Sequence, residues 1–97
     1  MAATETFLGE KYSLGGTCIS AEDHQYIENV EIVLYDVTQK ELKDLEFTNE
    51  KGVFIFNNLP KGEYYIRFKY FGKVLRTSPL LLIKNHTLLQ FEFSGDL

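Results

Sequence analysis

The fold of this chain can be traced to residues 48–68, which read TNEKGVFIFNNLPKGEYYIRF. Phenylalanine recurs at every second position of VFIF at 53–56, and Tyr64, Ile66 and Phe68 recur with the same spacing through YYIRF at 64–68. Neighbouring residues of a β-strand point to opposite faces of a sheet, so each alternation predicts a strand with one buried face. The connection NNLPKG contains Pro60 and Gly62, which favour a turn. The segment therefore predicts a β-hairpin.

Period-two alternation recurs along the rest of the chain, and no window has a convincing apolar period of 3.6, so we predict no helix. Runs of β-branched and aromatic residues, separated by clusters of Gly, Asn, Asp and Pro, indicate seven strands. Short connections favour antiparallel pairing, and short strands at this spacing are typical of a sandwich or barrel. The predicted strands are 13–20, 27–36, 42–48, 53–56, 63–70, 73–83 with a break at Pro79, and 87–93.

The 97 residues suffice for one domain with a single core. We expect residues 1–12 to form a flexible N-terminal lead-in and residues 13–97 to form the sandwich. The only cysteine, Cys18, is expected to be a small buried hydrophobe. Gly52 is expected to adopt a positive φ, and Gly15-Gly16 to mark a bulge or a close backbone contact. The rows assigned to the core are Val30, Ile32, Leu34; Phe54, Phe56; Tyr64, Ile66, Phe68; and Leu89, Phe91, Phe93.

The formal net charge of −4 argues against general polyanion binding, because nucleic-acid affinity depends on neutralising phosphates. Residues 1–50 hold three basic and eleven acidic residues, whereas residues 51–97 hold seven basic and three acidic ones. We expect strands from both halves to interleave and their charges to offset; the alternative is steering of a partner or a second copy. No run approaches the roughly 18 apolar residues that span a membrane, and the N-terminus lacks a signal-peptide pattern. We therefore expect neither a nucleic-acid partner nor membrane insertion.

No motif predicts chemistry. His24 and His86, the only histidines, fall in predicted turns. No Ser, Cys or Thr has a His and an acid at a recognised spacing, and there is no glycine-rich phosphate loop. The segment EDHQ lacks the alternating oxygen ligands of a calcium loop. We therefore predict that the chain is not an enzyme and has no catalytic, cofactor-binding or metal-ligating residues.

The residues opposite the core rows include apolar side chains interleaved with charges. Apolar residues that cluster on a surface mark partner sites, whereas scattered ones are ordinary. Two alternatives stay open. One is an exposed edge strand that pairs with another chain. The other is a carbohydrate-binding module that uses exposed tyrosine and phenylalanine rings, namely Tyr26, Tyr35, Tyr65, Tyr70 and Phe71. The predicted interaction face consists of Val33, Tyr35, Val53, Ile55, Tyr65, Arg67, Lys69 and Phe71.

The segment NVEIVLYD at 29–36, followed by residues 48–68, resembles carboxypeptidase-regulatory-like and collagen-adhesin B-type domains, which are transthyretin-like (prealbumin-like) β-sandwiches. Such domains combine a Thr-Asp-x-x-Gly turn, a Phe-x-Phe strand and a Leu-Pro-x-Gly turn, which correspond here to residues 48–52, 54–56 and 59–62. The resemblance spans about residues 14–93 and implies a seven-stranded antiparallel Greek-key sandwich. It implies a non-catalytic structural or protein–protein interaction module, with a protein partner or neighbouring domain. For a domain excised from a longer protein it favours an extracellular or cell-surface location.

The same resemblance excludes two activities of relatives. Some collagen-adhesin B-type domains join a first-strand Lys to a last-strand Asn with the help of a central acid, but Ile19 and Phe68 stand where the Lys and the acid are expected. Other relatives hydrolyse 5-hydroxyisourate with a first-strand His and a C-terminal Tyr-Arg-Gly-Ser. Here the first strand carries Thr17-Cys18-Ile19 and the chain ends in FEFSGDL. Neither activity is expected.

Overall fold

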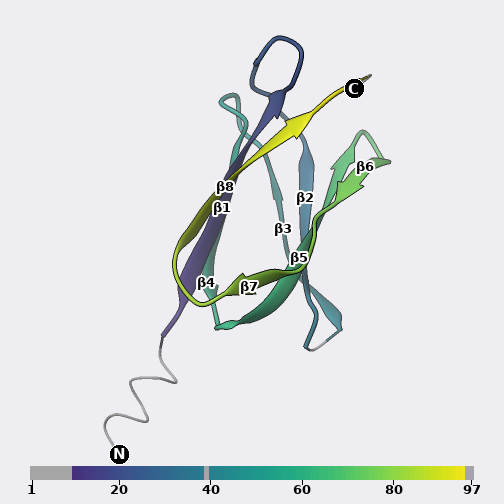
Figure 1. Cartoon of the computed structure of the whole chain (residues 1–97). Helices are drawn as coiled ribbons and strands as arrows, with labels where there is room; N and C mark the ends of the chain where they lie inside the picture. The colour runs from purple at the N-terminus through teal and green to yellow at the C-terminus, as the bar shows by residue number, and fades with distance from the viewer. Residues whose placement is uncertain (1–9, 39, 96–97) are drawn as a thin grey trace, which may run out of the picture.

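The computed structural model describes residues 10–38 and 40–95, which form eight strands in two packed sheets (Figure 1). Residues 1–9 of the expected lead-in lie outside the described residues. The described residues contain no helix, and therefore none that could cross a membrane. The predicted all-β sandwich is confirmed. A three-stranded sheet has the order β4 (Val53–Leu59), β1 (Tyr12–Ser20), β8 (Thr87–Phe93). A five-stranded sheet has the order β3 (Glu41–Phe47), β2 (Glu31–Asp36), β5 (Gly62–Tyr70), β6 (Lys73–Thr77). The fifth strand of that sheet, β7 (Leu81–Ile83), is also paired to β5.

The eight strands follow the predicted ones closely, with two differences. The segment 73–83 is two strands, β6 and β7, because Pro79 interrupts it. At this break the buried Ser78 takes over the pairing with β5: its backbone N–H donates to the Ile66 carbonyl, and its Oγ accepts from the Ile66 N–H. Residues 27–30, expected to begin a strand, precede β2, and Asn29 there has a φ of 68°. A positive φ is incompatible with an extended strand.

One pairing departs from the expected antiparallel pattern. The first and last strands of the structure, β1 and β8, run parallel over seven residue pairs from Leu14↔Thr87 to Ser20↔Phe93. All other strand pairs are antiparallel. Because β1 lies between β4 and β8, it is the central strand of its sheet.

The segment NNLPKG does not close a hairpin, so that prediction is wrong. β4 pairs with β1, whereas β5 pairs with β2 in the other sheet. The connection therefore carries the chain across the end of the sandwich. Leu59 is buried beneath this crossing, and the Tyr64 hydroxyl donates to the Pro60 carbonyl. These contacts close one end of the core.

The predicted core rows face one another between the sheets. All are buried except Leu89 and Phe91, which pack partly buried against the others. The Phe54 ring lies 6.2 Å from that of Phe91 and also covers Gly16, where a Cβ would lie 2.6 Å from the ring. A Cβ at Gly15 would also lie 3.2 Å from the Phe54 carbonyl oxygen, and one at Gly16 would lie 3.1 Å from that of Leu89, so the close backbone contact predicted at Gly15-Gly16 is confirmed. Cys18 is buried as expected, and burial raises the pKa of its thiol to about 12.

The turn TNEKG is held by the conformation of Gly52, which has the predicted positive φ, at 69°. A Cβ at this position would lie 2.5 Å from the Cys18 carbonyl oxygen. The turn is closed by the Asn49 side chain, whose Oδ1 accepts hydrogen bonds from the backbone N–H groups of Lys51 and Val53. Only glycine fits this backbone without strain.

Candidate interaction surface

The structure divides the predicted interaction residues between the two sheets. The outer faces of a sandwich point away from each other, so residues on opposite sheets cannot form one patch. The expectation of a single outward face is therefore corrected. Val53 and Ile55 lie in β4 of the three-stranded sheet, Val33, Tyr35, Tyr65, Arg67 and Lys69 lie in β2 and β5 of the five-stranded sheet, and Phe71 lies in the turn after β5.

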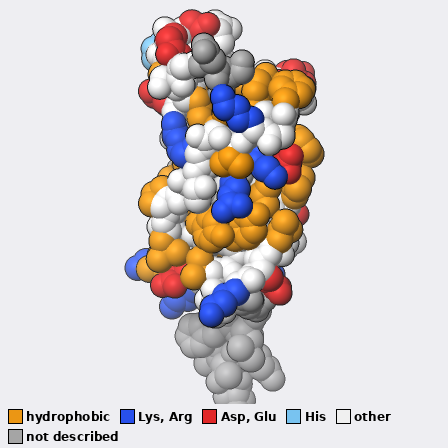
Figure 2. Space-filling view, turned by 90° about the vertical axis from the view of Figure 1, so that its right-hand side faces the viewer, with side chains coloured by type: hydrophobic (Ala, Val, Ile, Leu, Met, Phe, Trp, Pro, Cys, Tyr) orange, Lys and Arg blue, Asp and Glu red, His pale blue; other side chains and the backbone are white. Residues whose placement is uncertain are grey.

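The five-stranded sheet holds the larger part of the predicted set. Residues directly opposite each other on antiparallel strands share a face of the sheet. The pairings of β2 with β3 and β5 therefore place residues of all three strands on one outer surface. Viewed from this side, Figure 2 shows apolar side chains gathered around basic ones. We call this surface the β2–β5 face; it consists of Glu31, Val33, Tyr35, Leu42, Leu45, Phe47, Glu63, Tyr65, Arg67 and Lys69.

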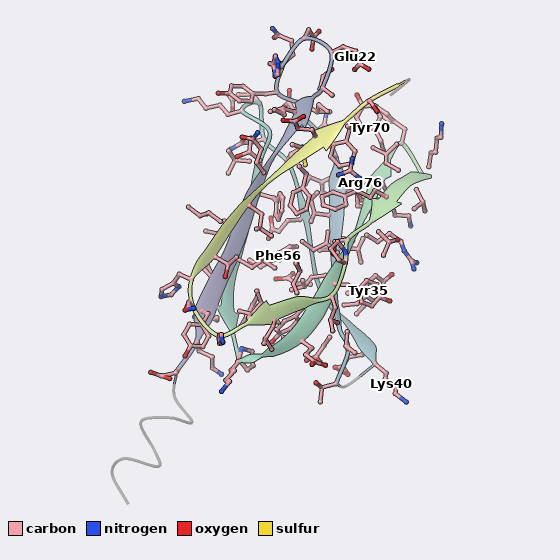
Figure 3. The ribbon with its side chains drawn as sticks, viewed as in Figure 1. Glu22, Tyr35, Lys40, Phe56, Tyr70 and Arg76 are labelled. Carbon is pink, nitrogen blue, oxygen red and sulfur yellow. The ribbon has the colours of Figure 1, made fainter. Side chains whose placement is uncertain are left out.

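An ordered aromatic and cationic stack lies at the centre of the β2–β5 face. Tyr35 and Tyr65 are directly paired, and their rings stack with centroids 4.9 Å apart and planes 13° apart. The Arg67 guanidinium carbon lies 5.3 Å from the centroid of the Tyr35 ring, within cation–π range. Figure 3 shows Tyr35 pointing away from the core, in contrast to Phe56, which points between the sheets. The stack holds side chains that would otherwise be free to rotate.

Val33 is the one predicted interaction residue that the structure buries, with 3% of its surface exposed. It occupies the middle of β2, an interior strand of the five-stranded sheet, and its paired neighbours are Leu45 on one side and Arg67 on the other. Surrounding side chains of the face close over a short residue in this position. Val33 therefore supports the face from beneath and is not available to a partner.

Sequence reasoning missed the apolar residues of β3. Leu42, Leu45 and Phe47 are exposed by 53%, 38% and 54% of their surfaces. The register shifts between Leu34 and Tyr35, so the apolar spacing in β3 is three residues and then two, which hides the alternation. All seven residues of β3 are exposed, because β3 is an edge strand that the narrower three-stranded sheet leaves uncovered.

A hollow of about 390 Å³ opens at the end of the β2–β5 face, beside the turn between β2 and β3. It is bordered by the buried Asp36 and by exposed Lys40 and Glu41. Tyr64 is paired with Asp36 across the two strands; burial, with a smaller contribution from the Asp36 carboxylate, raises the pKa of its hydroxyl. The hollow therefore combines aromatic walls with charges of both signs. Its lining is Tyr35, Asp36, Val37, Lys40, Glu41, Leu42 and Tyr65.

The two histidines lie at opposite ends of β1. The backbone N–H of Ser13 donates to Nδ1 of His86, whereas the backbone N–H of His24 donates to the Ser20 carbonyl. These ends are roughly 25 Å apart at the usual rise of a strand. Within residues 10–38 and 40–95, no group of three His, Cys, Asp or Glu side chains could hold a metal ion. The histidines therefore cannot act together on one substrate.

Residues 13–67 match the family of SpaA domains, described as a prealbumin-like fold domain. The chain belongs to this family. The match covers more than half of the chain, and it confirms the resemblance to transthyretin-like and collagen-adhesin B-type sandwiches. By sequence, no curated protein matches the chain.

Solved structures show the same prealbumin-like fold. BcpA, the major pilin subunit of Bacillus cereus, matches with a TM-score of 0.72 and 20% identity over 89% of this chain and 30% of the pilin. The Bacillus anthracis TIE protein matches with a TM-score of 0.68 and 25% identity over 87% of this chain and 17% of that protein. Klebsiella pneumoniae 5-hydroxyisourate hydrolase matches with a TM-score of 0.68 and 16% identity over 86% of this chain and 90% of the enzyme. The chain thus spans less than a third of the pilin, and its fold occurs in both pilins and an enzyme.

In this member of the family, thiol and aromatic groups fill the core beside the first and last strands. Cys18 of β1 is paired with Phe91 of β8, whose ring centroid lies 4.6 Å from that of Phe68 in β5. No lysine among the described residues is buried. In the described part of the chain, the interior beside these strands is therefore packed with aromatic rings and a thiol, without a buried lysine that could attack an asparagine side chain.

Proposed function

We propose that the chain is a non-catalytic structural module that docks onto another protein domain through its β2–β5 face. Membership of the SpaA prealbumin-like family and the likeness to domains of a pilin subunit support the structural role. The observation that carries the docking role is the ordered stack of Arg67, Tyr35 and Tyr65 beside the exposed apolar residues of β3.

The composition of the β2–β5 face suits a protein interface. Tyrosine and arginine are enriched where binding energy is concentrated, and exposed Leu and Phe supply apolar area that a partner can bury. Binding usually costs entropy, because flexible side chains become ordered. Arg67 and the two tyrosines are already held in the stack, so these three side chains lose less conformational entropy on binding than exposed Lys or Glu side chains would.

The outer face of the three-stranded sheet is less suited to docking, although it also exposes Val53, Ile55 and Leu88. Its central strand contributes Gly15 and Thr17 between these apolar residues, since Gly15 is paired with both Ile55 and Leu88. No ring stack or cation–π pair lies among these residues. We therefore place the docking site on the β2–β5 face.

Side-chain footprinting by hydroxyl radicals tests this proposal. Phe47 on the β2–β5 face and Tyr26, which bridges to Ile19 of the other sheet, are comparably exposed aromatic residues, at 54% and 60%. In the host cell, we expect Phe47 to be oxidised much less than in the purified chain, whereas Tyr26 serves as the control and reacts alike in both. Equal oxidation of Phe47 in both settings would show that no partner covers this face.

Carbohydrate binding is a second candidate, favoured by the hollow beside Tyr35 and Tyr65. Sugar rings stack on exposed aromatic faces, and charged groups such as Asp36 and Lys40 can contact hydroxyls. However, the two tyrosine rings stack against each other, so their mutual faces are not open to a ligand. A glycan array with the intact chain and with Tyr65→Ser tests this candidate: a hit that the variant loses would favour it, and an array without hits would eliminate it.

A further inference from the structure

We infer that the partner on the β2–β5 face is a second copy of this chain, related to the first by a two-fold axis. This inference rests on the proposed docking role of that face. The axis would lie between the two faces and perpendicular to β5, so that the β5 strands of the two copies run antiparallel over each other. The structural basis is the order of charges and rings along β5.

The outward residues of β5 form a self-complementary series. From one end to the other they are Glu63, Tyr65, Arg67 and Lys69. When this series is turned end over end, Glu63 of one copy lies over Lys69 of the other, and Tyr65 lies over Arg67. Each contact occurs twice because of the symmetry of an isologous dimer. Both contacts are favourable, the first between opposite charges and the second between a guanidinium and a ring.

The same axis matches the apolar residues of β3. Val33 is paired with Leu45 and Tyr35 with Leu42, so the two leucines flank the centre of the face on either side of the axis. The rotation therefore places Leu42 of one copy over Leu45 of the other. These leucines are half exposed in the single chain, and the contact would remove apolar surface from water. An unrelated partner would need to reproduce this order of charges and leucines in reverse.

The β2–β5 face can associate although the whole chain carries a net charge of −4, which makes distant copies repel each other. The β2–β5 face itself carries two acidic residues, Glu31 and Glu63, and two basic ones, Arg67 and Lys69, so its formal charges balance. Other acids, for example Glu22, lie in turns outside it. The net negative charge is therefore not concentrated where the copies meet. We expect a weak dimer that forms at high protein concentration.

Sedimentation velocity of the intact chain, between about 10 μM and about 1 mM, tests this inference. The expected result is a monomer that converts to a dimer as the concentration rises. Lys69→Glu and Glu63→Lys, each made alone, place like charges over each other at two contacts per dimer. Each is expected to raise the dissociation constant about tenfold.

The decisive variant combines Glu63→Lys with Lys69→Glu, because the swap restores opposite charges at both contacts. We expect its dissociation constant to return to within about threefold of the original value. Lys51→Glu and Glu92→Lys serve as matched controls, since both residues are exposed and lie outside the face. Circular dichroism confirms that each variant remains folded.

The possible outcomes separate this inference from the proposed function. A chain that stays monomeric throughout, or a dimer that none of the β5 variants weakens, overturns the two-fold contact. A swap that fails to restore association overturns the antiparallel alignment of the two β5 strands. If Phe47 is nevertheless protected in the host cell, the face docks a different protein, and the proposed function stands without this inference.

Discussion

Removing the Phe54 side chain tests which face of β4 is buried. Phe54 is 2% exposed, and its ring lies 5.8 Å from that of Phe56 and 6.5 Å from that of Phe68. Phe54→Ala removes a ring from this cluster and leaves a cavity, which costs about 3–5 kcal/mol. A domain of this size is stable by about 5–15 kcal/mol in total. We therefore expect Phe54→Ala to lose a large fraction of the free energy of unfolding of the domain.

The neighbouring Ile55 supplies a matched control, because it belongs to the same strand but is 46% exposed on the opposite side. Ile55→Ala is expected to cost less than about 1 kcal/mol, since little buried volume is lost. Urea unfolding followed by far-UV circular dichroism measures both variants, and Phe54→Leu extends the series if Phe54→Ala does not fold. Equal losses for positions 54 and 55 would refute the assignment of inward and outward faces in β4.

The remaining predictions concern the turn glycine, the buried thiol and the covalent state of the core. Gly52→Ala is expected to lose about 1–3 kcal/mol of stability, because φ is positive and the new Cβ meets the Cys18 carbonyl. Gly62→Ala should cost much less, since its Cβ would have no neighbour within 3.5 Å. Thermal unfolding distinguishes the two, and equal losses would contradict the backbone argument. Because the pKa of Cys18 is raised in the folded state, the unfolded chain binds fewer protons than the folded one between about pH 8.5 and about pH 12. The free energy of unfolding should therefore fall as the pH rises through this range. Urea titrations across this range should show a shallower decline for Cys18→Ala, and an unchanged slope would argue against burial of the thiol. A bond between a Lys and an Asn side chain would release one ammonia. We expect the intact mass to equal that of the linear sequence, because Cys18, Phe68 and Phe91 fill the core beside the first and last strands. A mass lower by one ammonia would indicate such a bond elsewhere in the chain.

The agreement between sequence and structure is greatest where the physical cause is local. Alternation with a period of two follows directly from strand geometry, and it located Phe54, Phe56, Tyr64, Ile66 and Phe68 in the core. The positive φ of Gly52 is likewise a property of one turn. These features depend on residues that are close together in the chain.

The candidate site was only partly predictable. The alternation correctly placed Tyr35, Tyr65 and Arg67 on an outward face, but it also included Val33, which its neighbours bury. It included Val53 and Ile55 as well, which belong to the other sheet. A pattern within one strand states which side a residue faces, but it does not state which sheet the strand joins.

The local sequence therefore determined the strands, their inward rows and the turn at Gly52, because these depend on short-range sterics and on burial of one side of each strand. Only the tertiary structure decided that NNLPKG crosses between sheets and that β1 and β8 run parallel. It also decided that β3 lies at an uncovered edge, where Leu42 and Phe47 are exposed. Strand pairing depends on backbone hydrogen bonds and on packing between residues far apart in the chain. The alternation within one strand does not specify either of them.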